Sequence, residues 1–183
     1  GLLSPLTVLF QLGQKIIFFP SDLIRNHKQG KEVEAMTKFR RENIGYVFQF
    51  FNLLQDLTVL ENILLIQELS DGRDEARARE LLALVGLEAE VNRFPAEISG
   101  GQQQRVAIAR SIAKSPNLLL GDELTGNLDS ATSSKVMEVL VSACEAEKIT
   151  TVMVTHDESL SRFATRVVRL DSGKIISDEM VSN

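Results

Sequence analysis

The chain has 183 residues, and at roughly 150 residues per domain this length allows one compact domain. Hydrophobic residues make up 44% and charged residues 25%, which excludes disordered, collagen-like and long coiled-coil chains. The net charge of −5 argues against nucleic acid or an anionic lipid surface as a partner. The longest apolar run, residues 81–85, is far shorter than the roughly 20 residues of a membrane-spanning helix. The single cysteine cannot close an intrachain disulfide, so a reducing, cytosolic setting is expected.

The first part of the chain offers few structural signals. Residues 1–12 are apolar but lack the positive leader of a signal sequence, so the chain is expected to begin inside a domain. Short apolar runs rich in β-formers predict strands over residues 16–19 and 44–48. Between them, residues 21–42 carry mixed charges typical of a solvated helix or loop.

From residue 57 onward, the hydrophobic period predicts an alternation of helices and strands. Apolar residues at helical spacing over 57–87, broken at 71–74, predict two helices of a small helical subdomain. The further predicted elements are a helix from residue 100 that ends before Pro116, a strand over 117–121, a helix over 130–147, a strand over 150–155 and a hairpin over 167–176. This order is typical of a parallel α/β sheet.

The strongest chemical signal is an apolar strand that ends in two acids, residues 118–123 with the sequence Leu-Leu-Leu-Gly-Asp-Glu. Such a strand delivers carboxylates to the carboxyl edge of a parallel sheet, where ligands bind. Asp122 is a candidate for holding a magnesium ion and Glu123 for polarising an attacking water, as phosphoryl transfer requires. Strands often end in acids without any such role, so a second signal is needed.

A second signal lies upstream, in residues 98–105 with the sequence Ile-Ser-Gly-Gly-Gln-Gln-Gln-Arg. Backbone amides bared by two glycines at a helix N-terminus favour an anion, so the expected ligand is a phosphate. Ser99 alone would indicate only an ordinary N-cap. Ser99 and Asp122 are 23 positions apart, which is enough for one helix and a turn, so loop, helix and acid-tipped strand form one connected unit.

These motifs resemble those of the ATP-binding-cassette (ABC) ATPases. Residues 99–102 resemble the signature motif of that family, and Asp122 with Glu123 resembles its Walker B motif. Gln49 lies where the family has its Q-loop, residues 127–129 resemble the D-loop, and residues 154–157, Val-Thr-His-Asp, resemble the switch-histidine loop. The motifs follow the family's order, so the resemblance does not depend on any one of them.

The resemblance implies an α/β fold, a P-loop NTPase-like domain with a mostly parallel sheet core and a small helical subdomain, truncated at its N-terminus. It implies a single ABC ATPase domain over residues 1–183. Within it, residues 1–49 would be a partial core with the Q-loop and residues 50–98 the helical subdomain. Residues 99–183 would carry the signature helix, Walker B, D-loop and histidine loop.

The resemblance also implies a role for each motif. Glu123 would orient the attacking water, His156 would contact the γ-phosphate, and Gln49 would link magnesium and the water to a groove for the membrane partner's coupling helix. Asp122 and Gln49 would hold the metal ion. The residues expected to bind nucleotide across a head-to-tail dimer are Ser99, Gly100, Gly101, Gln102 and Asp129.

Residues 47–54, 57–62 and 125–129 further resemble ATPases of the lipoprotein-release and macrolide-export type. The implied function is hydrolysis of ATP, with Mg²⁺ as cofactor, to drive export or lipoprotein release. The implied partners are transmembrane permease subunits and a second ABC ATPase subunit, in a homodimer or a heterodimer, and no nucleic acid. The implied location is the cytoplasmic, inner face of the cell membrane.

The sequence has no P-loop, G-x-x-x-x-G-K followed by Ser or Thr, which would surround the β- and γ-phosphates. The pairs Gly30-Lys31 and Gly173-Lys174 lack both the upstream glycine and the following hydroxyl residue. By the resemblance, the P-loop would precede the chain and residues 1–11 would form its helix. The chain's own ATP affinity is therefore expected to be severely reduced.

Two departures lie within the matched motifs, and two alternative functions remain. Gly121 stands where the family usually has Ala, and Leu124 replaces the preferred Pro, which bears on the aim of the Glu123 carboxylate. One alternative is a degenerate, catalytically dead subunit that lends its signature motif to a partner's ATP site. The other is an ABC-type DNA-repair or chromosome ATPase, which is disfavoured because only about 50 residues separate Gln49 from Ser99 and the net charge is negative.

Overall fold

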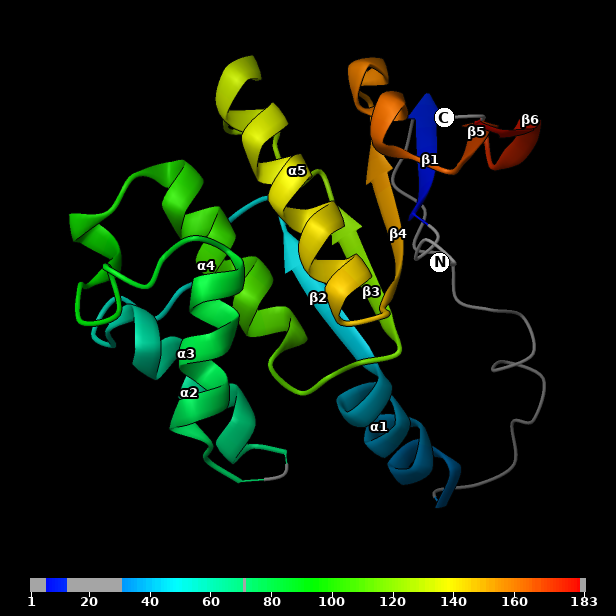
Figure 1. Cartoon of the computed structure of the whole chain (residues 1–183). Helices are drawn as coiled ribbons and strands as arrows, with labels where there is room; N and C mark the ends of the chain where they lie inside the picture. Colours follow the sequence, from blue (N-terminus) through cyan, green and yellow to red (C-terminus); the bar gives the residue numbers. More distant parts are fainter. Residues whose placement is uncertain (1–5, 13–30, 71, 182–183) are drawn as a thin grey trace.

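The computed structural model describes residues 6–12, 31–70 and 72–181 (Figure 1). Its 6-stranded sheet has the order β2-β3-β4-β1-β5-β6. The strands are β1 (Leu6–Leu12), β2 (Ile44–Phe48), β3 (Leu118–Asp122), β4 (Thr150–Thr155), β5 (Arg166–Asp171) and β6 (Lys174–Met180). The helices are α1 (Lys31–Asn43), α2 (Val59–Glu68), α3 (Glu75–Leu84), α4 (Gly100–Ile112) and α5 (Ser130–Ala146), with short 3₁₀ turns at Pro95–Glu97 and Glu158–Phe163. Neighbouring strands are parallel except for the β5–β6 hairpin, so the predicted α/β class is confirmed.

The predicted alternation of elements from residue 44 onward is confirmed. The break expected at 71–74 separates α2 from α3, and the helix predicted from residue 100 is α4. The apolar run before Asp122 forms β3, and the hairpin at the end of the chain is present as β5 and β6. Local patterns sufficed here because each apolar run is bounded by turn or capping residues.

The start of the chain differs from the prediction. A helix over residues 1–11 is wrong, because Leu6–Leu12 form β1, which is parallel to β4 on one side and to β5 on the other. A short apolar run cannot be assigned to helix or strand by periodicity alone, and here two parallel neighbours decide for the strand. The strand predicted over residues 16–19 lies outside the described residues.

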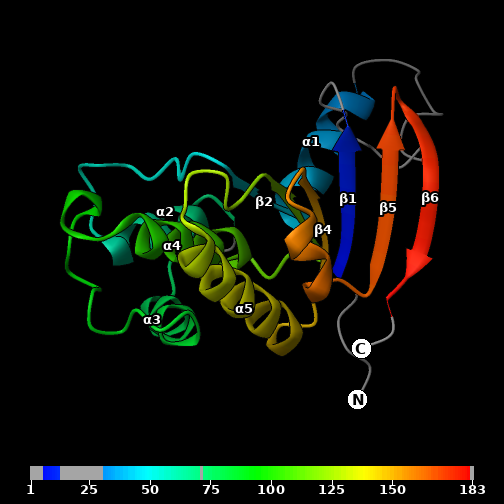
Figure 2. The same cartoon turned by 90° about the horizontal axis from the view of Figure 1, so that it is seen from above.

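The helices and the sheet share one buried core. Helices α2 and α3 lie beyond the β2 edge of the sheet, and β6 forms the opposite edge (Figures 1 and 2). Val136 and Met137 of α5 join Leu119 of β3 and Met153 of β4 in the same hydrophobic cluster. The acid-tipped strand is therefore held rigidly between its neighbours and α5. No helix within the described ranges combines the length and apolar character that a membrane crossing requires.

A buried asparagine shapes the segment that leads from β2 into α2. Asn62, 1% exposed, accepts from the amide of Leu54 at 2.9 Å and donates to the carbonyls of Leu54 and Leu57, each at 3.1 Å. The helix that carries it begins with a capping box between Thr58 and Glu61. Residues 54–58 are thereby tied to the first turn of α2.

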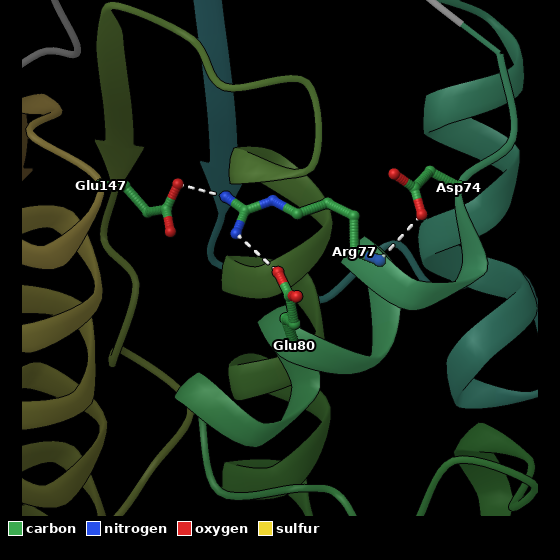
Figure 3. A network of polar contacts seen from close by, with 4 residues as sticks. All are labelled: Asp74, Arg77, Glu80 and Glu147. Atoms are coloured by element: carbon green, nitrogen blue, oxygen red, sulfur yellow. Dashed lines mark hydrogen bonds and ion pairs between the residues drawn. The ribbon is translucent and has the colours of Figure 1, made fainter.

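Arg77 joins α3 to the C-terminal end of α5 (Figure 3). Its guanidinium pairs with Glu147 and lies 3.4 Å from Glu80, while its main-chain amide donates to Asp74 at 2.9 Å. The side chains of Arg77 and Glu147 are 29% and 17% exposed, so this ion pair is largely shielded from water. Arg77 and Glu147 are 70 positions apart in sequence, so this contact ties two distant helices together.

We expect Arg77→Met to lower the free energy of unfolding by about 1–3 kcal/mol, because Glu147 loses a charge-assisted partner in a half-buried place. Urea-induced unfolding followed by circular dichroism measures the change. The matched control is Arg79→Met, which breaks the Arg79–Glu75 pair between side chains that are 49% and 53% exposed. It should cost less than about 0.5 kcal/mol, and equal losses in the two variants would contradict a special role for Arg77.

Candidate functional site

The carboxyl ends of β2, β3 and β4 meet at one edge of the sheet. In the parallel register, Asp122 is level with Phe48 on one side and with Val154 on the other. The residues that follow these three positions leave the sheet at the same edge, which is where parallel sheets bind ligands. Gln49, Glu123 and the histidine loop therefore start from adjacent points.

Glu123 and His156 are in direct contact. Nδ1 of His156 lies 3.2 Å from Oε1 of Glu123, and the two side chains are 68% and 25% exposed. Glu123 has a φ of 47°, a left-handed conformation that residues with a Cβ rarely adopt and that clusters at functional sites. Its amide donates to the carbonyl of Val154 at 2.9 Å, so this turn holds the carboxylate beside β4.

The two departures from the family motif fit each other. A Cβ built on Gly121 would lie 3.1 Å from two side-chain carbons of Leu124, and Leu124 is 1% exposed. The buried Leu124 side chain thus packs against the side of β3 where a residue larger than glycine would crowd it. Glu123, which lies between them in sequence, contacts His156 with its carboxylate.

The turn after β3 also contacts Gln49. A Cβ built on Gly126 would lie 2.8 Å from Nε2 of Gln49, so the glycine leaves room for the glutamine amide. Asn127 Nδ2 donates to the carbonyl of Gln49 at 3.2 Å, and the amide of Gly126 donates to the carbonyl of Glu123 at 3.0 Å. The structure therefore brings together Gln49, Asp122, Glu123 and His156, four of the residues that the sequence singled out.

The residues of the signature motif form the start of α4. Ser99 Oγ accepts from the amide of Gln102 at 3.3 Å, and Gln102 Oε1 accepts from the amide of Ser99 at 2.8 Å. Gln102 Nε2 also donates to Glu90 at 3.2 Å. This capping box fixes the entry of the helix and leaves Gly100 and Gly101 in its first turn, where the helix dipole favours an anion.

Asp129 caps α5. Its carboxylate accepts from the amides of Ala131 and Thr132 and, at 2.6 Å, from the Thr132 hydroxyl. The pKa of Asp129 lies below its ordinary value, first because of the Thr132 hydroxyl and then because of the Thr132 amide. The predicted nucleotide-binding aspartate is thus an exposed, ionised N-cap in this conformation.

Gly101 brings α4 close to the start of α5. A Cβ at this position would lie 2.5 Å from Cγ2 of Thr132, and a β-branched side chain is too stiff to yield easily. We expect Gly101→Ala to lower the free energy of unfolding by about 1–3 kcal/mol. Adding Thr132→Ser removes the methyl group and keeps the hydroxyl, so the double variant should regain most of this loss in thermal unfolding. A double variant as unstable as Gly101→Ala would refute the steric explanation.

The donor set at the strand ends suits Mg²⁺. Asp122 offers a carboxylate and Gln49 an amide oxygen, both half-buried at the edge of the sheet. Magnesium typically takes one or two protein oxygens and completes its shell with phosphate oxygens and water. Among the residues that the structure describes, no group of three or more His, Cys, Asp or Glu could hold a metal ion.

Sequence reasoning missed the side chains that donate hydrogen bonds to the main chain on either side of Gln49. Arg110 of α4 donates to the carbonyls of Phe51 and Asn52, and Gln104 of the same helix donates to the carbonyl of Phe48. A signal was present, since Arg110 interrupts the apolar pattern of a helix whose other residues around it are buried. A half-buried arginine in such a place indicates a fixed acceptor nearby.

The fold is similar to solved structures of known function. The dimeric structure of MJ0796, described as a bacterial ABC transporter cassette, has a TM-score of 0.72 and 32% identity and covers 98% of this chain and 86% of that one. A post-hydrolysis state of the same cassette, bound to ADP and Pi, gives the same TM-score. This likeness defines the fold of an ATP-binding cassette, a mixed α/β domain.

Sequence comparison identifies the family. A family profile described as ABC transporter matches residues 17–126. An uncharacterized ABC transporter ATP-binding protein of Mycobacterium tuberculosis is 50% identical over 143 residues, covering 76% of this chain and 58% of that protein. The lipoprotein-releasing system ATP-binding protein LolD of Geobacter metallireducens is 48% identical over 147 residues, covering 79% and 65%. The chain belongs to the ABC transporter family of ATP-binding proteins, and it spans less than two thirds of the length of these two relatives.

Proposed function

We propose that this chain binds and hydrolyses ATP, with Mg²⁺, as part of an ABC transporter of the lipoprotein-release type. The observation that carries the proposal is the contact between Glu123 and His156 at the edge where Asp122 and Gln49 also lie. The relatives called lipoprotein-releasing system proteins support the transporter type.

The proposed chemistry uses these residues in separate roles. Glu123 orients and polarises the attacking water, and His156 holds the Glu123 carboxylate and faces the terminal phosphate. Asp122 and Gln49 hold the magnesium ion, which when bound offsets the charge of the phosphates. A carboxylate that follows the end of a strand and contacts a histidine is well placed to act as a general base.

The proposed partners lie at two surfaces. Ser99 and Asp129 are exposed, so the starts of α4 and α5 are open to a second ATPase subunit in a head-to-tail dimer, in which residues 99–102 and Asp129 contact its nucleotide. Beside Gln49, the side chains of Phe48, Phe50 and Leu54 are 46%, 70% and 48% exposed. We assign this apolar surface to the transmembrane permease partner, which places the chain at the cytoplasmic face of the membrane. The division into 1–49, 50–98 and 99–183 belongs to the same proposal.

The position of β1 bears on the missing P-loop. A P-loop connects a strand to a helix, and β1 is parallel to β4, so its carboxyl end at Leu12 points to the same edge as His156. The sequence after Leu12 is Gly-Gln-Lys-Ile-Ile-Phe-Phe-Pro, residues 13–20. It has the first glycine of the pattern but not the second glycine, the lysine or the hydroxyl residue. We therefore infer that this fold places a P-loop directly after β1.

The test is to complete the pattern with Phe18→Gly, Phe19→Lys and Pro20→Ser and to measure binding of ATP and Mg²⁺ by titration calorimetry. We expect the affinity to rise on the order of tenfold or more over the unchanged chain, because the variant then has the lysine and the hydroxyl residue of the phosphate-binding pattern. The matched control carries Phe19→Met in place of Phe19→Lys and should stay weak. Equal affinities of the lysine and methionine versions would contradict the placement of the P-loop.

The second candidate function is that of a degenerate subunit that completes a partner's ATP site. The observation that favours it is the start of α4, where Ser99 is exposed and a capping box holds Gly100 and Gly101 in the first turn. The test mixes this chain with a P-loop-bearing LolD relative whose own signature serine has been replaced. Recovery of hydrolysis by the native chain but not by Ser99→Arg is the result that this candidate requires.

A further inference from the structure

The main chain that carries Gln49 is held by side chains from other elements. We call residues 48–52 the Q-loop segment. The contacts are Gln104 Nε2 to Phe48 O at 3.4 Å, Asn127 Nδ2 to Gln49 O at 3.2 Å, Arg110 Nη2 to Phe51 O at 3.1 Å and Arg110 Nη1 to Asn52 O at 2.6 Å. Every donor is a side chain and every acceptor is a main-chain carbonyl, so the contacts fix the path of the backbone.

Beyond Phe48, which ends β2 beside Asp122 and stacks on Tyr46, apolar burial holds little of this segment. Phe48 and Phe50 are largely exposed, and only Phe51 packs against the hydrophobic core. Asn52 has a φ of 50°, a left-handed conformation that asparagine adopts more readily than most residues with a Cβ. The polar contacts are therefore needed to hold a conformation that apolar burial does not secure.

Arg110 is the strongest of these donors. Both of its described partners are neutral carbonyls, and its planar guanidinium reaches two successive residues at once, which a lysine ammonium could not do in the same way. Burial lowers the pKa of Arg110, which shows that the charged group has lost water on entering this place. Within the described residues, the hydrogen bonds of this half-buried charge therefore go to the main chain of the Q-loop segment.

We propose that Arg110 and Asn127 are positioning residues, which hold the Q-loop segment so that the side-chain amide of Gln49 stays over Gly126 beside Glu123. The role of Gln49 at an ATP site rests on the proposed function, but the positioning does not. Arg110 lies on the helix that begins with the signature motif, and Asn127 lies in the turn that begins with Glu123. A displacement of either element therefore moves Gln49.

The experiment follows the side-chain amide of Gln49 by ¹⁵N–¹H nuclear magnetic resonance in the full chain without nucleotide. The Gln49 signal is identified by its loss in Gln49→Met. Gly126→Ala serves as the positive control, because its Cβ would lie 2.8 Å from the amide nitrogen. The test variants are Arg110→Met, Arg110→Lys and Asn127→Ala, and amide hydrogen exchange of residues 49–54 is measured in each.

Arg105 provides the matched negative control. It lies on the same helix and also donates to two main-chain carbonyls, those of Val85 at 2.9 Å and Gly86 at 3.3 Å. These carbonyls are at the end of α3 and not in the Q-loop segment. Arg105→Met therefore removes the same chemistry from a different place.

We expect Arg110→Met and Asn127→Ala to shift or broaden the Gln49 signal and to speed exchange over residues 49–54 on the order of tenfold. Arg110→Lys should recover part of the native signal, and Arg105→Met should leave it unchanged. An unchanged Gln49 signal in Arg110→Met and Asn127→Ala, or an equal change in Arg105→Met, overturns the proposal. If Arg110→Met does not fold, Asn127→Ala still tests the proposal, because Asn127 is exposed. Because no nucleotide is present, failure of ATP binding by the P-loop variant would leave this result intact.

Discussion

We expect Glu123→Gln to lower the rate of ATP hydrolysis by about 10²–10⁴-fold in the chain that carries Phe18→Gly, Phe19→Lys and Pro20→Ser. An amide keeps the size of the side chain and its hydrogen bonding to His156, but it cannot accept a proton from the attacking water. Binding of ATP should change little, because the Glu123 side chain acts on the water and not on the nucleotide. Phosphate release measured at saturating ATP and Mg²⁺ gives the rate.

The control for this experiment is Glu158→Gln, which removes the same charge from an exposed residue that follows the histidine loop. Its rate should stay within about twofold of the parent, as for most surface substitutions. If Glu123→Gln retains more than about a tenth of the parent rate, Glu123 is not the general base. If ATP binding falls together with the rate, the substitution has disturbed the strand end rather than the chemistry.

The largest expected effect on stability is that of Leu119→Ala, which should lower the free energy of unfolding by about 2–5 kcal/mol. Leu119 is 0% exposed at the centre of β3, and its Cδ1 would lie 2.8 Å from a Cβ on Gly45 of β2. The cavity cannot be refilled from Gly45, because a Cβ there also meets the carbonyl oxygen of Ser111 at 2.6 Å. Urea unfolding measures the loss.

Leu120→Ala is the matched control, since Leu120 is half-buried and its side chain lies on the opposite face of the same strand. It should cost about 1 kcal/mol, because less apolar area is lost from a site that water already reaches. Similar losses in the two variants would show that the core does not depend on the face of β3 that carries Leu119. A Leu119→Ala variant that loses less than about 1 kcal/mol would show that the site collapses around the smaller residue.

The order of the elements from residue 44 onward was predictable because the information is local. A few neighbouring residues are enough to predict each of three elements. These are the apolar strand followed by acids, the helix that starts with Ser-Gly-Gly and the β-branched strand before His156. The start of the chain was not predictable in this way. Residues 6–12 contain the β-formers Thr7, Val8 and Phe10, but only their pairing with β4 and β5 decides between strand and helix.

The candidate site was predictable only in part, for a similar reason. The residue types that phosphoryl transfer needs could be read from Gln49, Asp122, Glu123 and His156, but no spacing gives the contact between Glu123 and His156, which are 33 positions apart. The packing of Leu124 against Gly121 could not be predicted, because comparison with the motif treats each position separately and does not show which side chains touch.

By itself, the sequence determined which residues stand at the ends of strands and starts of helices, because capping, period and turn chemistry act over a few neighbours. The tertiary structure alone decided which of those ends meet and what holds them there. Arg110 shows the difference: its type and place on the helix are in the sequence, but its partners lie 58 and 59 positions away. Hydrogen bonds of that reach depend on how α4 packs against the sheet, and no local pattern encodes that packing.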